Sequence, residues 1–236
     1  MKNSVIIYGY TTLGVKIANI LDEKGYKVII VDFEPLALEK AQKEGFITHD
    51  STLLNDNELV ELGIGSSIDS LFCVSNSNKN NLFVTLSARN LDKNLKIIST
   101  SKTKAESKKL MIAGATKVLN PNELAAFRIY RYMTKPLMLK VLDEILFSKS
   151  DLNISEISIT KDSKLDGKLL KEITSHKKFN ILLIGIMDKE RGNNFIFNAK
   201  GINHKIDEGD ILVVVGKSSD LRNFRNYIIG VANDAV

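Results

Sequence analysis

The first thirty-two residues place the strongest constraint on what this chain can fold into. An apolar strand pattern over Ser4–Tyr8 is followed by a glycine-containing bend and a helical pattern that runs to about Lys24. A second strand pattern, Lys27–Val31, ends at Asp32, eighteen residues after Gly14. This order predicts the first β-α-β unit of a dinucleotide fold, in which a tight turn exposes backbone N–H groups at a helix N-terminus that favours phosphate.

One glycine of the usual phosphate-binding pattern is replaced. In G-x-G-x-x-G the first and last positions are Gly9 and Gly14, but the middle position is Thr11. Gly9 permits the turn and Gly14 lets the helix approach the sheet, whereas Thr11 prevents the closest backbone approach to phosphate and offers a hydroxyl donor instead. Asp32 stands where a carboxylate accepts ribose hydroxyls. The pattern suggests a nucleotide site with an altered phosphate loop.

Helical and strand patterns continue to alternate as far as Pro121. We expect helices over residues 36–43, 55–62, 80–90 and 105–112, and strands over 46–48, 68–74, 95–99 and 117–119. Six strands joined by helices predict an α/β fold with a mostly parallel, doubly wound, Rossmann-like sheet. Right-handed crossovers then bring the carboxyl ends of the strands to one edge, where the ligand should bind.

The candidate nucleotide-binding residues follow from that edge. They lie on the first bend and on the loops that follow the later strands, and they are Gly9, Tyr10, Thr11, Thr12, Leu13, Gly14, Asp32, Phe33, Asp50, Ser51, Ser75, Asn76 and Asn81. Four or five polar contacts of this kind explain micromolar nucleotide binding without catalysis. Taken singly, Ser75, Asn76 and Asn81 also fit a role as loop-capping residues, so both interpretations stay open.

Residues 124–147 form two apolar helical segments separated by Lys135 and Pro136. Charged side chains within both segments exclude a membrane span. Helices this apolar need a cover, and we expect a second subunit to supply it. The alternative is that they pack on their own sheet.

The pattern changes again beyond the polar linker at residues 148–151. Strands are expected over 153–160, 180–187, 195–198 and 210–216, one or two helical turns over 168–174, and a last amphipathic helix near 220–229. This is a small α+β module. The predicted organisation is a Rossmann-like domain over residues 1–134, a crossover helix and linker over 135–150, and a C-terminal subdomain over 151–236.

Composition and charge argue against a nucleic-acid-binding, secreted or membrane-spanning protein. The 236 residues carry a formal charge of +5, but the lysines are dispersed among acids, which argues against nucleic-acid binding. The N-terminus has no signal-peptide pattern, and no window approaches eighteen uncharged apolar residues. The lone Cys73 lies in an apolar run and suits a reducing compartment. We therefore expect a cytosolic protein.

The succession of these features resembles the RCK domains, also called the Trk-type NAD-binding family, which regulate prokaryotic potassium channels and transporters. The residues that carry the likeness are 5–9, Gly14, Asp32, 49–52, 75–81 and 113–121 in the first module, and 163–168 and 206–216 in the second. The resemblance implies a cytoplasmic gating domain at the inner face of the membrane that binds NAD(H), ATP or ADP as a regulatory ligand. It also implies a homodimer formed through the helical crossover, and a tetrameric or octameric ring of dimers under a potassium channel pore or a transporter membrane subunit.

The loop at residues 100–102 departs from the family pattern. Thr100 stands where the family often has arginine, which weakens a claim to phosphate contact there. Calcium-gated members place acids in this stretch, and Thr100 and Lys102 cannot replace them, so we expect no calcium site in this loop.

An NAD-dependent oxidoreductase is the competing class. Such an enzyme needs a proton donor or base beside the nicotinamide. His49 falls near the ribose side, while His176 and His204 fall in loops of the second module. We therefore predict no catalytic residues and no metal site, and a regulatory role in potassium transport, as part of a channel or alternatively as a subunit of a Trk/Ktr-type uptake transporter.

Overall fold

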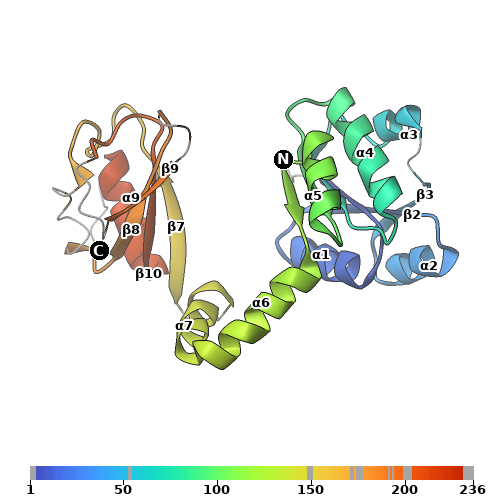
Figure 1. Ribbon diagram of the computed structural model, residues 1–236. Helices are drawn as coiled ribbons and strands as arrows, with labels where there is room; N and C mark the ends of the chain where they lie inside the picture. The colour runs from blue at the N-terminus through green and yellow to red at the C-terminus, as the bar shows by residue number, and fades with distance from the viewer. Residues whose placement is uncertain are drawn as a thin grey trace. The chain divides into compact units, whose positions relative to one another are not determined.

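The chain divides into two compact units, Met1–Tyr130 and Arg131–Val236 (Figure 1). The computed structural model describes residues 4–52, 55–147, 151–170, 173, 178–190, 192, 194–198 and 204–230. The sequence-based boundaries after residues 134 and 150 remain a prediction.

The first unit is built on a parallel sheet. In its described part the strands are β1 (Ser4–Tyr8), β2 (Lys27–Asp32), β3 (Ile47–Asp50), β4 (Ile68–Cys73), β5 (Lys96–Thr100) and β6 (Lys117–Leu119). They lie in the order β3-β2-β1-β4-β5-β6, and every neighbouring pair is parallel. This is the doubly wound order of a Rossmann fold, which confirms the predicted fold class.

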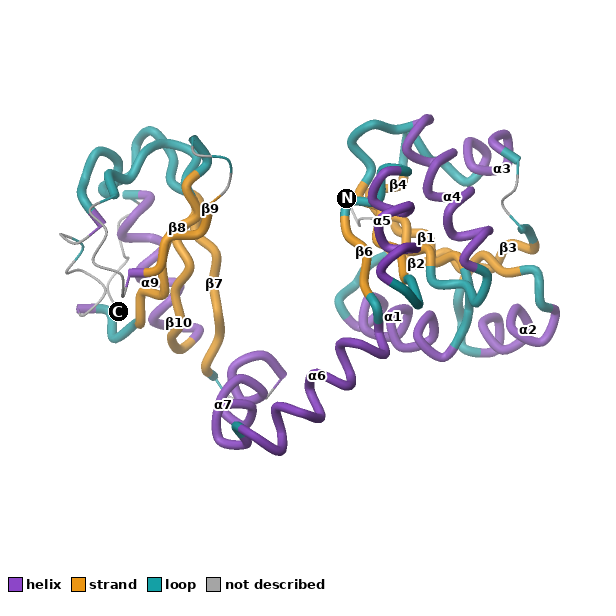
Figure 2. The backbone as a smooth tube through the Cα atoms, in the orientation of Figure 1, coloured by secondary structure: helices purple, strands orange, loops and turns teal. Residues whose placement is uncertain are grey.

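Helices cover both faces of this sheet, as Figures 1 and 2 show. Their bounds are α1 (Thr12–Glu23), α2 (Pro35–Lys43), α3 (Asp56–Glu61), α4 (Asn78–Leu91) and α5 (Lys104–Ile112). Successive side chains of a strand point to opposite faces, so Val5 and Ile7 pack with α1 and α2, whereas Ile6 and Tyr8 pack with α3 and α4. The central strand is therefore buried on both sides, as its continuous apolar run requires.

Two element bounds differ from the predicted ones near the candidate site. β3 runs to Asp50 because its last residues pair with β2, with Asp50 opposite Asp32, so His49 and Asp50 belong to a strand and not to a loop. α4 begins at Asn78, two residues early, because the Ser77 hydroxyl accepts a hydrogen bond from Asn80 N at 3.3 Å and caps the helix.

The second unit contains a small antiparallel sheet. Its described strands are β7 (Leu152–Ser158), β8 (Leu182–Asp188), β9 (Asn194–Phe197) and β10 (Ile211–Lys217), in the order β7-β10-β8-β9. Helix α9 (Ser218–Ile229) packs its Leu221, Phe224 and Ile228 into the core of this sheet. The predicted α+β module is confirmed. The helical turns expected over 168–174 fall partly outside the described residues; Leu169 instead forms an isolated β-bridge with Lys205.

Helices α6 (Pro121–Thr134) and α7 (Pro136–Phe147) join the two modules in sequence. The break falls at Lys135, where the following proline cannot continue the helix, as expected. Helix α6 carries no buried residue, and its Ile129 and Met133 are 64% and 80% exposed. No helix in the described ranges is long and apolar enough to cross a bilayer.

Candidate functional site

The strand order places a crevice between the carboxyl ends of β1 and β4. Strand β1 pairs with β2 on one side and with β4 on the other. Strands β2 and β3 extend the sheet in one direction from β1, and β4, β5 and β6 extend it in the other. Open α/β sheets bind ligands at such a point. Two cavities of about 460 and 400 Å³ lie here, and they share Thr11, Ser75 and Asn76.

The first bend and the β4–α4 loop touch each other through a glycine. Gly9 has φ +103°, and a Cβ built on it would lie 2.5 Å from both Cα and N of Ser75. At Gly14 a Cβ would lie 2.1 Å from the carbonyl oxygen of Gly9. Both positions therefore require glycine for close backbone contact, and this contact sets the floor of the crevice.

The Thr11 hydroxyl is used inside the protein. It donates a hydrogen bond to Val74 O at 3.1 Å and accepts one from Gly14 N at 3.3 Å. Thr11 is thus the N-cap of α1 and ties that helix to the end of β4. The hydroxyl proton that the sequence offers to phosphate is directed to Val74. The backbone N–H groups of the first turn of α1, which begins at Thr12, are the kind of donors that can bind an anion at this bend.

Asp32 joins the two loops on the other side of the crevice. Its Oδ2 accepts a hydrogen bond from Tyr10 N at 2.6 Å, and its Oδ1 accepts from Phe33 N at 2.8 Å and from Glu34 N at 3.1 Å. The residue is only 7% exposed, yet it lines the smaller cavity. Two carboxylate oxygens accept about four hydrogen bonds, so capacity remains for a ribose hydroxyl.

The Asn81 side chain holds the loop that follows β4. It is fully buried, and its Oδ1 accepts hydrogen bonds from Ser75 N at 3.2 Å and Ser75 Oγ at 2.8 Å, while its Nδ2 donates to Ser75 O at 2.9 Å. The side chain therefore clamps the turn after β4. Of the two roles that the sequence left open for Asn81, this geometry matches loop capping, whereas Ser75 and Asn76 themselves line both cavities.

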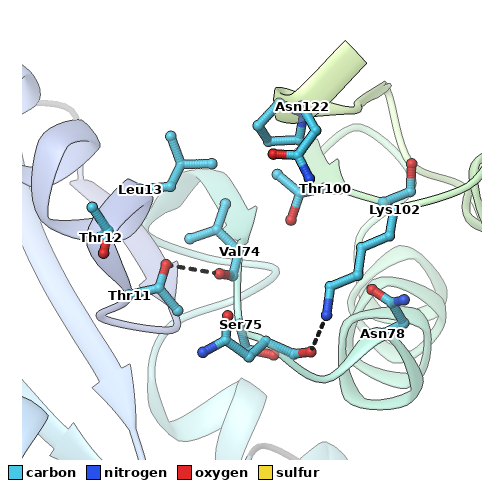
Figure 3. Close-up of a pocket in the computed structure, with 12 residues that line it drawn as sticks. Thr11, Thr12, Leu13, Val74, Ser75, Asn78, Thr100, Lys102 and Asn122 are labelled. Carbon is cyan, nitrogen blue, oxygen red and sulfur yellow. Dashed lines mark hydrogen bonds between the residues drawn. The ribbon is translucent and has the colours of Figure 1, made fainter. Parts of the chain in front are cut away.

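The larger cavity contains a cation that the sequence did not single out for this role. Thr11, Thr12 and Leu13 form one wall, and Thr100, Lys102 and Asn122 come from the opposite side (Figure 3). Lys102 Nζ reaches across and donates to Asn76 O at 3.5 Å. No motif marks Lys102 in the sequence; its place emerges only because β5 lies beside β4 in the sheet.

The other candidates lie around these cavities in different ways. Phe33 lines the smaller cavity and is 44% exposed. Tyr10 lines it too, but its hydroxyl donates to Glu44 Oε2 at 2.5 Å, and burial and this carboxylate raise the pKa of the phenol. Asp50 and Ser51, at the end of β3, line neither cavity; the Ser51 hydroxyl donates to Glu58.

Comparison with known proteins matches both modules. The model of the TrkA-N domain family matches residues 5–121, and that of the TrkA-C domain family matches residues 154–229. Potassium channel protein 1 of Methanocaldococcus jannaschii is 26% identical over 235 residues, which are 98% of this chain and 68% of that protein. Probable potassium channel protein 2 of the same organism is 26% identical, over 97% of this chain and 67% of its own length. The chain thus spans about two thirds of these relatives.

Solved structures agree on the fold. The TrkA-N domain of the inner membrane protein ybaL from Escherichia coli has a TM-score of 0.52 at 14% identity, and covers 56% of this chain and 96% of its own. The GsuK channel bound to NAD has a TM-score of 0.50 at 17% identity, and the match covers 98% of this chain but only 39% of GsuK. The two matched family domains together make up most of the chain, in the order in which the Rossmann-like sheet and the small antiparallel sheet follow each other, and the chain therefore belongs to the TrkA-N/TrkA-C, or RCK, family.

Proposed function

We propose that this chain is a cytoplasmic regulatory region of a potassium transport system and that its first unit senses an adenine nucleotide. The observation that carries the proposal is the crevice between β1 and β4, where Gly9, Asp32 and the N-terminus of α1 converge. These are the groups that a Rossmann fold uses for the turn, the ribose and the phosphate.

The two cavities accommodate the two ends of such a ligand. In this proposal the adenosine lies beside Asp32 and Phe33 in the smaller cavity, and the phosphates pass the first turn of α1 into the larger one. Lys102 then supplies positive charge to the distal phosphate or to the second half of NAD(H). Volumes of about 460 and 400 Å³ lie within the range of small-molecule sites.

A regulatory role is favoured over an NAD-dependent oxidoreductase by the kind of relatives found. The two methanogen proteins that align across both modules are potassium channel proteins. The chain spans about two thirds of their length, so a pore is the partner that we propose for it. A membrane subunit of a Trk/Ktr-type transporter is the alternative partner.

We also propose that the chain works as a homodimer within a larger ring at the inner face of the membrane. The support is the apolar surface of α6 and α7, which exposes Leu124, Ile129 and Met133 on α6 and Leu137 and Val141 on α7. A second subunit that covers these side chains would link two nucleotide sites, and the break at Lys135 would allow the helices to hinge. Gating requires the nucleotide to bind the open and closed forms with different affinity, normally by about 1–3 kcal/mol per site.

The proposal is tested by the thermal stability of the purified chain with ATP, ADP, NAD and NADH. We expect at least one of them to raise the unfolding midpoint of the wild type, and the Asp32→Asn variant to lose this shift because it removes the ribose acceptor charge. The Asp50→Asn variant is the matched control, since Asp50 lines neither cavity. A nucleotide shift that persists in Asp32→Asn, or no shift in the wild type, would contradict a nucleotide site in this crevice.

A further inference from the structure

Two aspartates and a histidine meet in the interior of the second unit. Asp188 ends β8, Asp210 directly precedes β10, and both are at most 2% exposed. The imidazole of His204 lies between them, with Nδ1 3.5 Å from Asp188 Oδ2 and Nε2 3.0 Å from Asp210 Oδ2. One ligand atom from each residue falls within 4.8 Å of the others.

The strand register explains why these carboxylates are close. Ile211 pairs with Met187 and Leu212 with Ile186 in the antiparallel ladder. Continuing that register by one residue sets Asp210 opposite Asp188. Like charges directly opposite each other destabilise a sheet, and buried carboxylates are costly unless a cation or donor lies between them. The pair therefore calls for a positive group at this position, which His204 provides only when it carries a second proton.

The backbone holds one of the carboxylates in place. Asp210 Oδ1 accepts a hydrogen bond from Lys189 N at 3.1 Å, and Asp210 Oδ2 accepts one from Asp207 N at 3.1 Å. The carbonyl of His204 accepts from Leu170 N at 2.7 Å, which anchors the backbone that carries the imidazole. Such outer contacts orient ligating side chains in metal sites, and here they come from three different segments of the module.

We propose that Asp188, His204 and Asp210 bind a transition-metal dication of the Zn²⁺ class. A metal ion takes only one nitrogen of an imidazole, and one such nitrogen lies within 4.8 Å of a carboxylate oxygen from each aspartate. Ligand atoms about 2.0–2.1 Å from a tetrahedral zinc ion are about 3.3 Å apart, so the three side chains would close in on a bound ion. An imidazole ligand favours zinc and its neighbours over Ca²⁺ and Mg²⁺, which prefer all-oxygen sites. A dication removes the repulsion between the carboxylates without a second proton on His204. This site lies in the C-terminal module, and it does not depend on the proposed nucleotide crevice.

The test is Zn²⁺ binding to the whole chain after chelator dialysis, followed by calorimetry in two buffers of different ionisation enthalpy. The wild type is expected to bind one Zn²⁺ per chain and to release a proton, because metal and proton compete for the imidazole. His204→Gln and Asp210→Asn should each weaken binding at least tenfold. His49→Gln and Asp162→Asn, which remove the same groups outside the trio, should bind like the wild type, and Ca²⁺ and Mg²⁺ should not compete.

A second measurement uses only the wild type, so it does not depend on whether the variants fold. X-ray absorption at the zinc edge should give only nitrogen and oxygen neighbours, with a single imidazole. A protein that takes up no stoichiometric Zn²⁺, a zinc environment with sulfur or several imidazoles, or equal binding in folded His204→Gln would overturn the proposal. Each of these results would leave His204 as a bridge between two aspartates with no metal ion.

Discussion

Gly9 lies where the bend after β1 touches the loop after β4. Its φ of +103° and the 2.5 Å separation between a built Cβ and the backbone of Ser75 mean that two different constraints act on one position. The second constraint is the more severe, because backbone atoms cannot move aside as a flexible side chain does. Asn81 holds Ser75 from its other side through hydrogen bonds to the Ser75 backbone, so Gly9 and Asn81 together fix the floor of the crevice.

Substitution of Gly9 by alanine should therefore destabilise the first unit by about 3 kcal/mol or more. Gly25→Ala is the control: Gly25 has φ +81° with nothing within 4 Å of a built Cβ, so only the left-handed backbone cost of about 1–2 kcal/mol remains. Chemical denaturation followed by circular dichroism compares the two. Equal losses of stability in Gly9→Ala and Gly25→Ala would mean that the loops after β1 and β4 can move apart at no cost in free energy.

Cys73 gives a prediction about pH. The thiol is fully buried beside Thr85, and burial raises its pKa from the ordinary 9.0 to about 12. A group whose pKa is raised by folding stabilises the fold below its unfolded pKa and loses that contribution as pH rises towards the folded pKa. Stability should thus fall between about pH 9 and 12, and Cys73→Ala should show a shallower fall.

The native thiol of Cys73 should resist a disulfide reagent at pH 8 until the protein unfolds. Rapid labelling of the folded protein would contradict this burial.

Part of the geometry of the candidate site can be predicted from single residues. Gly9, Gly14 and Asp32 follow from spacing alone, because a β-α-β unit fixes the distance between the turn and the second strand. Lys102 does not, because its position depends on which strands are neighbours and no local pattern records that. The sequence offers the Thr11 hydroxyl to phosphate and leaves Asn81 open between a ligand contact and loop capping. The structure directs the hydrogen bonds of these two side chains to Val74 and Ser75.

Arg89 holds several elements of the first unit together at the amino ends of β5 and β6. The guanidinium of Arg89, in the last turn of α4, donates to the carbonyl oxygens of Gly114, Asp92, Lys93 and Leu95 at 2.6–3.0 Å. A Cβ on Gly114 would lie 2.3 Å from Arg89 Cγ, which explains a glycine at the end of α5. One side chain thus connects α4, the start of β5 and the turn before β6.

Removal of that side chain should separate these elements. We expect Arg89→Ala to cost about 2–4 kcal/mol, because several carbonyl groups lose a charged donor at once. Arg89→Lys should recover little, since an ammonium group lacks the planar fork that reaches all four oxygens. Lys93→Ala, at an exposed neighbour, should be nearly neutral. Thermal unfolding measures all three, and a neutral Arg89→Ala variant would show that water replaces these bonds.

Element types were more predictable than element ends. The strands of the first unit are short apolar runs between turn residues, and this pattern located all of them. The observed ends differ from the predicted ones where a contact elsewhere in the fold sets the end. Strand β3 extends to Asp50 because its last residues pair with β2, and α4 begins at Asn78 because Ser77 caps it. Pairing partners and caps are properties of the folded chain, so a single sequence records them weakly.

At the scale of the whole molecule, the exposed apolar side chains of α6 and α7 form the surface that we propose a second subunit covers. We expect light scattering after size-exclusion chromatography to give a dimer or a larger even assembly. Ile129→Asp and Met133→Asp, at strongly exposed positions of α6, should shift the mass towards the monomer because a carboxylate would be buried at the interface. Lys104→Glu changes the charge of a side chain that belongs to α5, outside α6 and α7, and should not shift the mass. A wild-type monomer at all concentrations would contradict a second subunit as the cover.

Hydrogen–deuterium exchange with and without saturating ADP or NAD would locate a bound nucleotide in the wild-type chain. A nucleotide in the crevice should slow exchange in the peptides that contain residues 9–14, 32–34 and 75–78, since these surround the two cavities. The Asp32→Asn variant should show no such protection under the same conditions. Unchanged exchange in those peptides, or protection confined to the second unit, would contradict a nucleotide-sensing crevice between β1 and β4.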